Sequence, residues 1–157
     1  MQAVNSNVSS NVYLGTEFVL TLPTIDDIIT HIVAIGKGGL LYKVDIARAF
    51  RQLKIDPADY KFLGLYHEGY YLDLSLPFGY IHGSKFFQHC SDSIGFIMRS
   101  FGVKVVNYID DVIACGNTQQ AYAGHEKLLQ VLSELGLDIN EEKCTSFHKN
   151  GMSRYRN

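Results

Sequence analysis

Three aspartates, Asp45, Asp110 and Asp111, are the residues whose types and spacing could do chemistry. Asp45 ends a short apolar run, and Asp110-Asp111 separate two β-branched runs, so all three are expected at strand ends. A carboxylate in apolar surroundings is costly unless it is paired or bound to metal. If the two strands are neighbours in a sheet, the carboxylates converge, and their mutual repulsion raises their pKa values.

A divalent cation would relieve that repulsion, and oxygen ligands alone suit Mg²⁺ or Mn²⁺. Two such ions about 3.5–4 Å apart can activate an attacking oxygen and stabilise a leaving one in phosphoryl transfer. Plainer interpretations also fit each aspartate taken alone. Asp is common in turns, which would explain Asp110-Asp111, and Asp45 could cap a following helix.

The composition indicates a folded domain, because 46% of the 157 residues are hydrophobic. A net charge of −2 argues against a protein that is basic over a whole nucleic-acid-binding face, so any such role must come from a local site. Three widely spaced cysteines predict free thiols in a reducing compartment, and hence an intracellular protein. We expect no signal peptide and no membrane partner, because no apolar run approaches the roughly 20 residues needed to span a bilayer.

Hydrophobic periodicity predicts an alternation of helices and short strands. Thr24 with Asp27 predicts a capped helix start, Gly36 to Gly39 form a turn rather than a phosphate loop, and Thr118 is the expected cap of a later helix. Helices are predicted over 25–35, 83–100 and 119–135, and strands over 40–46, 62–66, 70–74, 103–108, 112–115 and 137–139. This order predicts an α+β fold of the ferredoxin-like kind, an antiparallel sheet with helices packed on one face.

Four motifs in this order resemble those of retroelement reverse transcriptases, and they cover roughly residues 20–145. They are VDIARAF at 44–50, LPFG at 76–79 with the GS and FQ that follow it, YIDD at 108–111, and the LGL to EEKC segment at 135–144. The sequences of two segments, YKVDIARAFRQLKIDP and LPFGYIHGS, are most similar to those of retrotransposons of the DIRS-like or LTR type. The resemblance implies a polymerase palm.

The resemblance also implies a role for each site residue. Asp45 and Asp110 would bind two Mg²⁺ (or Mn²⁺) ions, Asp111 would complete the site, and the main-chain carbonyl of Ile46 would add a ligand. Lys143 would be the general acid for the pyrophosphate leaving group. A surface lysine in the EEK charge run is the alternative for Lys143.

The remaining implied roles concern the nucleotide and the primer. Phe50 would lie under the sugar of a deoxynucleoside triphosphate and leave no room for a 2′-hydroxyl. Phe78 and Gly79 would contact nucleotide and template, and Tyr108 the primer end. Phe50 as a core aromatic and Tyr108 as a strand aromatic are the alternatives. Arg48 and Arg51 could face phosphate or solvent, with solvent favoured for Arg51.

The implied domain organisation is a polar segment over 1–19, a remnant of a fingers region, then a partial palm over 20–146 and an irregular tail over 147–157. Residues 1–19 contain no Lys or Arg to grip a triphosphate, and the tail does not resemble a primer grip. Fingers, thumb and RNase H domains are therefore expected to be absent. Two competing hypotheses follow. One is a non-catalytic retroelement fragment, and the other is a different palm nucleotidyl transferase, such as an RNA-directed RNA polymerase or a cyclase.

Overall fold

The computed structural model describes residues 19–149, and within it the chain forms two compact units. Unit 1 comprises residues 48–87 together with 19–21, and unit 2 comprises 22–47 and 88–149. Each unit is described by itself.

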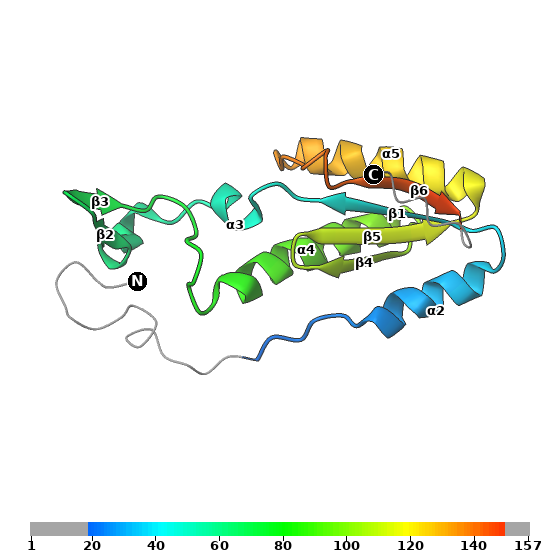
Figure 1. Cartoon of the computed structure of the whole chain (residues 1–157), viewed down its shortest axis with the longest axis horizontal. Coiled ribbons are helices and arrows are strands. Elements are labelled where there is room, and N and C mark those ends of the chain that lie inside the picture. Colours follow the sequence, from blue (N-terminus) through cyan, green and yellow to red (C-terminus); the bar gives the residue numbers. More distant parts are fainter. Residues whose placement is uncertain (1–18, 150–157) are drawn as a thin grey trace. The chain divides into compact units, whose positions relative to one another are not determined.

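A four-stranded antiparallel sheet is the centre of unit 2 (Figure 1). Its strands, in spatial order, are β4 (Val105–Tyr108), β5 (Asp111–Gly116), β1 (Leu40–Asp45) and β6 (Thr145–Lys149). β5 pairs with β1 on one side and with β4 on the other, both antiparallel. The predicted α+β class with an antiparallel sheet is thus confirmed.

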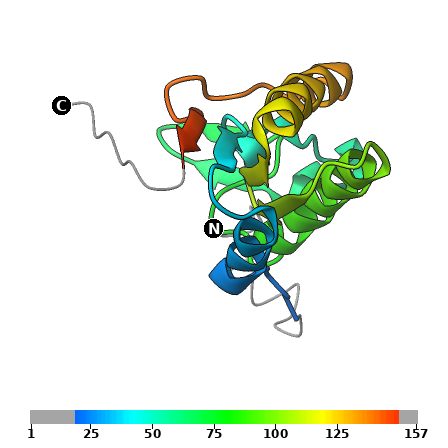
Figure 2. The same ribbon diagram turned by 90° about the vertical axis from the view of Figure 1, so that its right-hand side faces the viewer.

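One face of this sheet carries the main core beneath α4 (Gly83–Ser100), which from Gln88 on belongs to unit 2, and α5 (Thr118–Glu134) (Figure 2). Alternate strand positions supply this face because successive side chains of a strand point to opposite sides. The buried members from strands and helices are Tyr42, Val44, Val112, Ala114, Ile94, Met98, Leu128 and Leu132.

The opposite face of the sheet is only partly covered. Helix α2 (Ile25–Ile35) packs its buried Ile28 against Val106 and Cys115, with Leu41 and Ile113 beside them. Further along β1 and β5 the same face carries Lys43 and, on the last aligned pair, Asp45 opposite Asp111. This face is therefore apolar under α2 and charged at the other strand end.

The helix ends show which local signals were correct. Helix α2 begins and ends where predicted, with the Asp27 carboxylate accepting from the amide of Thr24 at 2.6 Å. Helix α4 also has the predicted bounds. For α5 the predicted cap, Thr118, was wrong. Asn117 caps the helix, because its Oδ1 accepts from the Gln120 amide at 3.0 Å while Gln120 Oε1 accepts from the Asn117 amide at 3.2 Å.

The C-terminal strand was not predicted. Residues 147–149, expected to begin an irregular tail, belong to β6 and pair with β1, while residues 1–18 and 150–157 lie outside the described residues. The predicted strand at 137–139 is reduced to a single bridge between Ile139 and Ile46. The three cysteines have free thiols. Within residues 19–149, no helix has the length and apolar character to cross a membrane.

Unit 1 contains two short helices and a hairpin. They are α3 (Ala49–Gln52), the 3₁₀ helix η1 (Pro57–Phe62), β2 (Gly64–Tyr66) and β3 (Tyr70–Leu72). An ion pair joins α3 to the residue that follows β3, since Arg51 Nη1 lies 2.6 Å from both carboxylate oxygens of Asp73. The Arg51 side chain is 40% exposed, so the expectation that it faces solvent is confirmed, although it also forms this ion pair. The partner of its guanidinium group is the carboxylate of Asp73, 22 residues away in the sequence.

The Arg51–Asp73 pair makes the stability of unit 1 sensitive to acid. Burial alone would raise the pKa of Asp73, but hydrogen bonds from Arg51 and the Ser75 amide, with the Arg51 charge, hold that pKa below its usual value. A lowered folded-state pKa means that the pair stabilises the fold above the unfolded value of about 3.9, and that this contribution is lost as pH falls through the folded value.

We expect Arg51→Met to lower the free energy of unfolding near neutral pH, and the difference from the wild type to shrink below about pH 3. Urea unfolding followed by circular dichroism between about pH 2 and 7 measures this. Lys61→Met removes a nearby cation that lies over the Phe62 ring, and should give a difference that does not vary over this range. An Arg51→Met deficit independent of pH would contradict the assignment.

Candidate active site

The site is built from the adjoining ends of β1 and β5. Asp45 is directly opposite Asp111 in the antiparallel register, so both side chains leave the same face of the sheet. Asp110 lies in the turn before β5, and its carbonyl accepts a hydrogen bond from the Ile46 amide at 2.8 Å. The three predicted aspartates therefore lie at one end of the β1–β5 ladder.

The turn that carries Asp110 is strained. Ile109 and Asp110 connect β4 to β5, and Ile109 has φ +53°. Two-residue hairpins favour positive φ at the turn, usually with Gly or Asn. A β-branched residue there is a genuine outlier, costing on the order of 1–3 kcal/mol. Such a conformation persists only where the surroundings hold it.

Gln88 of α4 provides that restraint. Its Oε1 accepts from the Ile109 amide at 2.8 Å, and its Nε2 donates to the Asn107 carbonyl at 3.0 Å. The Gln88 side chain is 2% exposed, so these bonds form away from water. One buried amide thus holds the turn on both sides of Tyr108.

Neighbouring polar groups complete the contact between α4 and β4. Asn107 Nδ2 donates to the Ser91 carbonyl at 2.6 Å and to Ser91 Oγ at 3.1 Å. The buried positions of α4 include Gln88 and Ser91 as well as the apolar Phe87, Ile94 and Met98. The missed signal is a pair of polar residues on the buried stripe of an otherwise apolar helix face.

Asp45 is the most enclosed of the three carboxylates, with 5% of its surface exposed. Burial raises its pKa, Lys143 and Lys43 oppose this, and the charges of Asp111 and Asp110 add to it, with a net rise. Repulsion from the two neighbouring carboxylates thus adds to a rise in the Asp45 pKa that burial dominates. The alternative that Asp45 caps a helix was wrong, because Arg48 occupies the N-cap position of α3.

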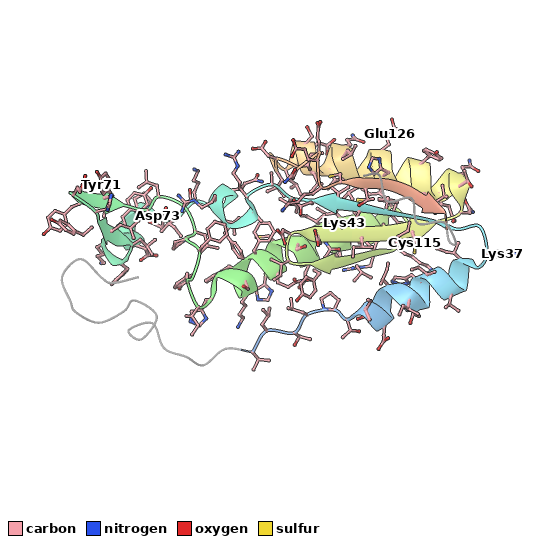
Figure 3. The ribbon with its side chains drawn as sticks, in the orientation of Figure 1. Lys37, Lys43, Tyr71, Asp73, Cys115 and Glu126 are labelled. Carbon is pink, nitrogen blue, oxygen red and sulfur yellow. The ribbon has the colours of Figure 1, made fainter. Side chains whose placement is uncertain are left out.

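Two lysines supply positive charge to the carboxylates. Lys43 Nζ lies 2.7 Å from Asp111 Oδ1, and Lys143 Nζ lies 3.9 Å from Asp45 Oδ2 (Figure 3 labels Lys43). Burial alone would lower the pKa of Lys43, but its hydrogen bond to Asp111 and the charges of the three aspartates raise it overall. Lys143 was predicted at the site, whereas Lys43 was missed.

The donor chemistry fits a divalent cation that prefers oxygen. Asp45 and Asp111 place carboxylates on one sheet face, and the pKa of Asp45 is raised by burial first and by the neighbouring carboxylates second. Within residues 19–149, however, no three or more His, Cys, Asp or Glu side chains are arranged as a ready-made metal site. The aspartates lie together at one end of the β1–β5 ladder. In this structure the cations beside Asp111 and Asp45 are the ammonium groups of Lys43 and Lys143.

The other predicted residues are placed as follows. In unit 1, Phe50 meets Phe78 edge-on with centroids 5.5 Å apart, and Phe78 is 68% exposed. Gly79 follows with φ +80°, a conformation that favours glycine. In unit 2, Tyr108 is aligned with Asp111 across the β4–β5 ladder and is 46% exposed.

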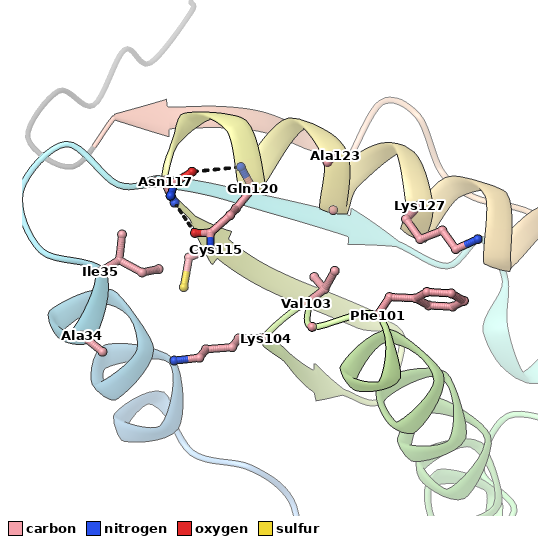
Figure 4. Close-up of a pocket in the computed structure, with 12 residues that line it drawn as sticks. Ala34, Ile35, Phe101, Val103, Lys104, Cys115, Asn117, Gln120, Ala123 and Lys127 are labelled. Atoms are coloured by element: carbon pink, nitrogen blue, oxygen red, sulfur yellow. Dashed lines mark hydrogen bonds between the residues drawn. The ribbon is translucent and has the colours of Figure 1, made fainter.

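A cavity of about 680 Å³ in unit 2 does not include these carboxylates (Figure 4). It lies among α2, α5 and the end of β5, and its lining includes Cys115, Asn117 and Gln120. Asn117 and Gln120 are bonded to each other's amides at the start of α5, and burial raises the pKa of the Cys115 thiol. These groups offer no reactive centre, so the open strand ends remain the candidate site.

An antiparallel sheet backed by two helices, with aspartates at the adjoining ends of its central strands, is the arrangement of a polymerase palm. The chain belongs to the reverse transcriptase (RNA-dependent DNA polymerase) family, whose family model matches residues 2–155. No curated protein matches the chain.

Solved structures of a viral reverse transcriptase have the same fold. The native prototype foamy virus protease-reverse transcriptase matches with a TM-score of 0.64 and 16% identity, over 83% of this chain and 17% of that one. The foamy viral enzyme in complex with ds DNA matches with a TM-score of 0.66 and 16% identity, over 73% of this chain and 20% of that one. The chain thus spans about a fifth or less of the length of these two proteins.

We expect Gln88→Leu to release the strained turn. The Ile109 amide would lose its buried acceptor, which costs about 1–3 kcal/mol of unfolding free energy, and hydrogen exchange at that amide should accelerate. Gln130→Leu is the matched control on α5, because Gln130 is exposed and its described hydrogen bonds join it to the side chains of Lys127 and Glu134 on the same helix. Equal effects of the two substitutions would contradict the role assigned to Gln88.

Proposed function

We propose that this chain is the palm of an RNA-directed DNA polymerase. In this role, Asp45, Asp110 and Asp111 hold two Mg²⁺ or Mn²⁺ ions, and a nucleotide passes from a dNTP to a primer 3′-hydroxyl. The observation that carries the proposal is the cross-strand pairing of Asp45 with Asp111 at the adjoining ends of β1 and β5, with Asp110 in the turn before β5. Membership of the reverse transcriptase family supports the same reaction.

The metal ions would supply charge neutralisation and an activated attacking oxygen. The protein's part is to hold the carboxylate oxygens in place before substrate arrives. The Ile46 amide fixes Asp110 through its carbonyl, and Gln88 fixes the turn through the Ile109 amide. We assign the main-chain carbonyl of Ile46 as a further ligand.

Lys143 is proposed as the general acid that protonates the leaving pyrophosphate. Its ammonium lies 3.9 Å from Asp45 Oδ2 while 64% of the side chain is exposed, so it is close to the carboxylates and still accessible. A lysine in a purely surface charge run would have no reason to lie against the buried carboxylate of the site.

Phe50, Phe78 and Gly79 are proposed to bind the nucleotide. Phe50 and Phe78 form one aromatic contact in unit 1, with the Phe78 ring exposed, and a ring under the sugar would exclude the 2′-hydroxyl of a ribonucleotide. Tyr108, half-exposed beside Asp111, is proposed to contact the primer end.

The proposed partner is a template-primer of RNA or DNA. Two of the similar structures are described as foamy viral protease-reverse transcriptase in complex with ds DNA and with an RNA/DNA hybrid. We further propose a retrotransposon origin, DIRS-like or LTR-type, because of the sequences of the motifs. The free cysteines support a second proposal, an intracellular location.

A second candidate is a folded but non-catalytic member of the family. It is favoured by the lack, within residues 19–149, of a preformed metal cluster. It predicts the same fold with no incorporation of nucleotide under any metal condition.

Primer extension by the longest open reading frame that includes these residues, on an RNA template with Mg²⁺, separates the candidates. We expect extension, and a loss of at least about a hundredfold in Asp110→Asn, the scale of removing one group that stabilises transition-state charge. Glu126→Gln, an exposed acid-to-amide change on α5, is the control. Absence of extension by the wild type favours the non-catalytic candidate.

Unchanged extension by Asp110→Asn would overturn the site assignment. Comparing ribonucleotide with deoxyribonucleotide incorporation in the same assay separates a reverse transcriptase from an RNA-directed RNA polymerase. The expected result is a strong preference for deoxyribonucleotides, because Phe50 would exclude the 2′-hydroxyl.

A further inference from the structure

Lys43 lies in the candidate site but has no part in the proposed reaction. It precedes Asp45 by two residues on β1, so the two side chains share a sheet face, and its diagonal neighbour across the ladder is Asp111. The Lys43 ammonium lies 2.7 Å from Asp111 Oδ1. That oxygen is shielded from solvent, and within residues 19–149 no other group donates a hydrogen bond to it.

The Lys43 ammonium lies where a cation shared by the aspartates would have to approach Asp111. The three aspartates lie at the same strand ends, yet no three acidic groups form a ready-made cation site in the described part of the chain. The Asp111 oxygen that could face a shared ion is instead directed at Lys43. A lysine ammonium and a divalent cation would compete for that oxygen, because both are cations and the ammonium already lies within 2.7 Å of it.

We propose that Lys43 is an internal counter-cation that holds Asp111 in the metal-free protein and must leave Asp111 before a divalent ion binds there. The inference rests on the proposed function insofar as the aspartates are metal ligands. Lys43 is thus a positioning residue, which acts through Asp111 and sets how strongly the site takes up metal.

The surroundings of the pair allow the exchange. The side chains of Lys43 and Asp111 each keep 31% of their surface exposed, so the ammonium can withdraw into water on its flexible four-carbon stem. No proton has to move, since the ammonium stays charged throughout. Lys143 provides the comparison, because it is 3.9 Å from its carboxylate and 64% exposed, and therefore competes less.

The test measures Mn²⁺ affinity of the 157-residue chain by electron paramagnetic resonance of free Mn²⁺. We expect Lys43→Met to bind Mn²⁺ about tenfold more tightly than the wild type, the scale of removing one unit charge near a partly exposed ligand. Lys143→Met should tighten binding by a smaller factor. Lys37→Met removes the same charge from the turn before β1, at the far end of the strand, and should leave the affinity unchanged (Figure 3).

A second measurement uses the melting temperature with and without Mn²⁺. Lys43→Met should melt below the wild type in EDTA, because the shielded Asp111 oxygen loses its one cation, and should gain more than the wild type when Mn²⁺ is added. Adding Asp111→Asn to Lys43→Met should abolish the extra gain, which separates loss of the counter-cation from a general packing defect.

Equal or weaker Mn²⁺ binding by Lys43→Met would overturn the proposal, as would the absence of saturable binding in both proteins. Tighter binding that survives Asp111→Asn would also overturn it. The proposed polymerase function is judged separately, by the Asp110→Asn comparison in primer extension. A Lys43→Met gain in affinity without any polymerase activity would support the counter-cation role and reject the function.

Discussion

The antiparallel register of β1 with β5 is the constraint on which the site depends. It aligns Asp45 with Asp111 and, two residues earlier, Lys43 with Ile113. A slip of one residue would turn every side chain of β1 to the opposite face. The register is specified because Val44 and Val112 must enter the core beneath the helices while their neighbours face outward. Hydrophobic burial on one face thereby places the charges on the other.

Strain in the hairpin turn is a second consequence of the same pairing. The register leaves two residues between Tyr108 and Asp111, and the turn forces Ile109 to a positive φ that a β-branched residue rarely adopts. Gln88 offsets that cost with two buried hydrogen bonds from α4. Gln88 and Ser91, the buried polar residues of α4, therefore support the site from behind. Among the interactions described they contact none of the three site aspartates.

Local signals in the sequence were sufficient for some of these features and insufficient for others. Helix α2 was predictable because a capping pair, a 3.6-residue period and a glycine stop agree. Strand β6 was missed because it is short, its sequence TSFHK is mostly polar, and it pairs with β1, which is distant in the sequence. The Arg51–Asp73 pair and the Lys43–Asp111 contact join residues 22 and 68 positions apart, and composition or periodicity carries no information about such partners. The aspartates themselves were identified by motif order, whereas their convergence required knowing which strands are neighbours.

The buried charge of Asp45 opposes the stability of the fold. Burial and like charges raise the pKa of Asp45, so its ionised form destabilises the folded state near neutral pH. The two lysines reduce this cost without removing it, since one is 3.9 Å away and largely exposed. A cation bound only by the folded state would stabilise it by mass action. Binding of a cation beside Asp45 would therefore offset part of the cost of burying its charge, and the same contact would couple metal binding to the stability of the fold.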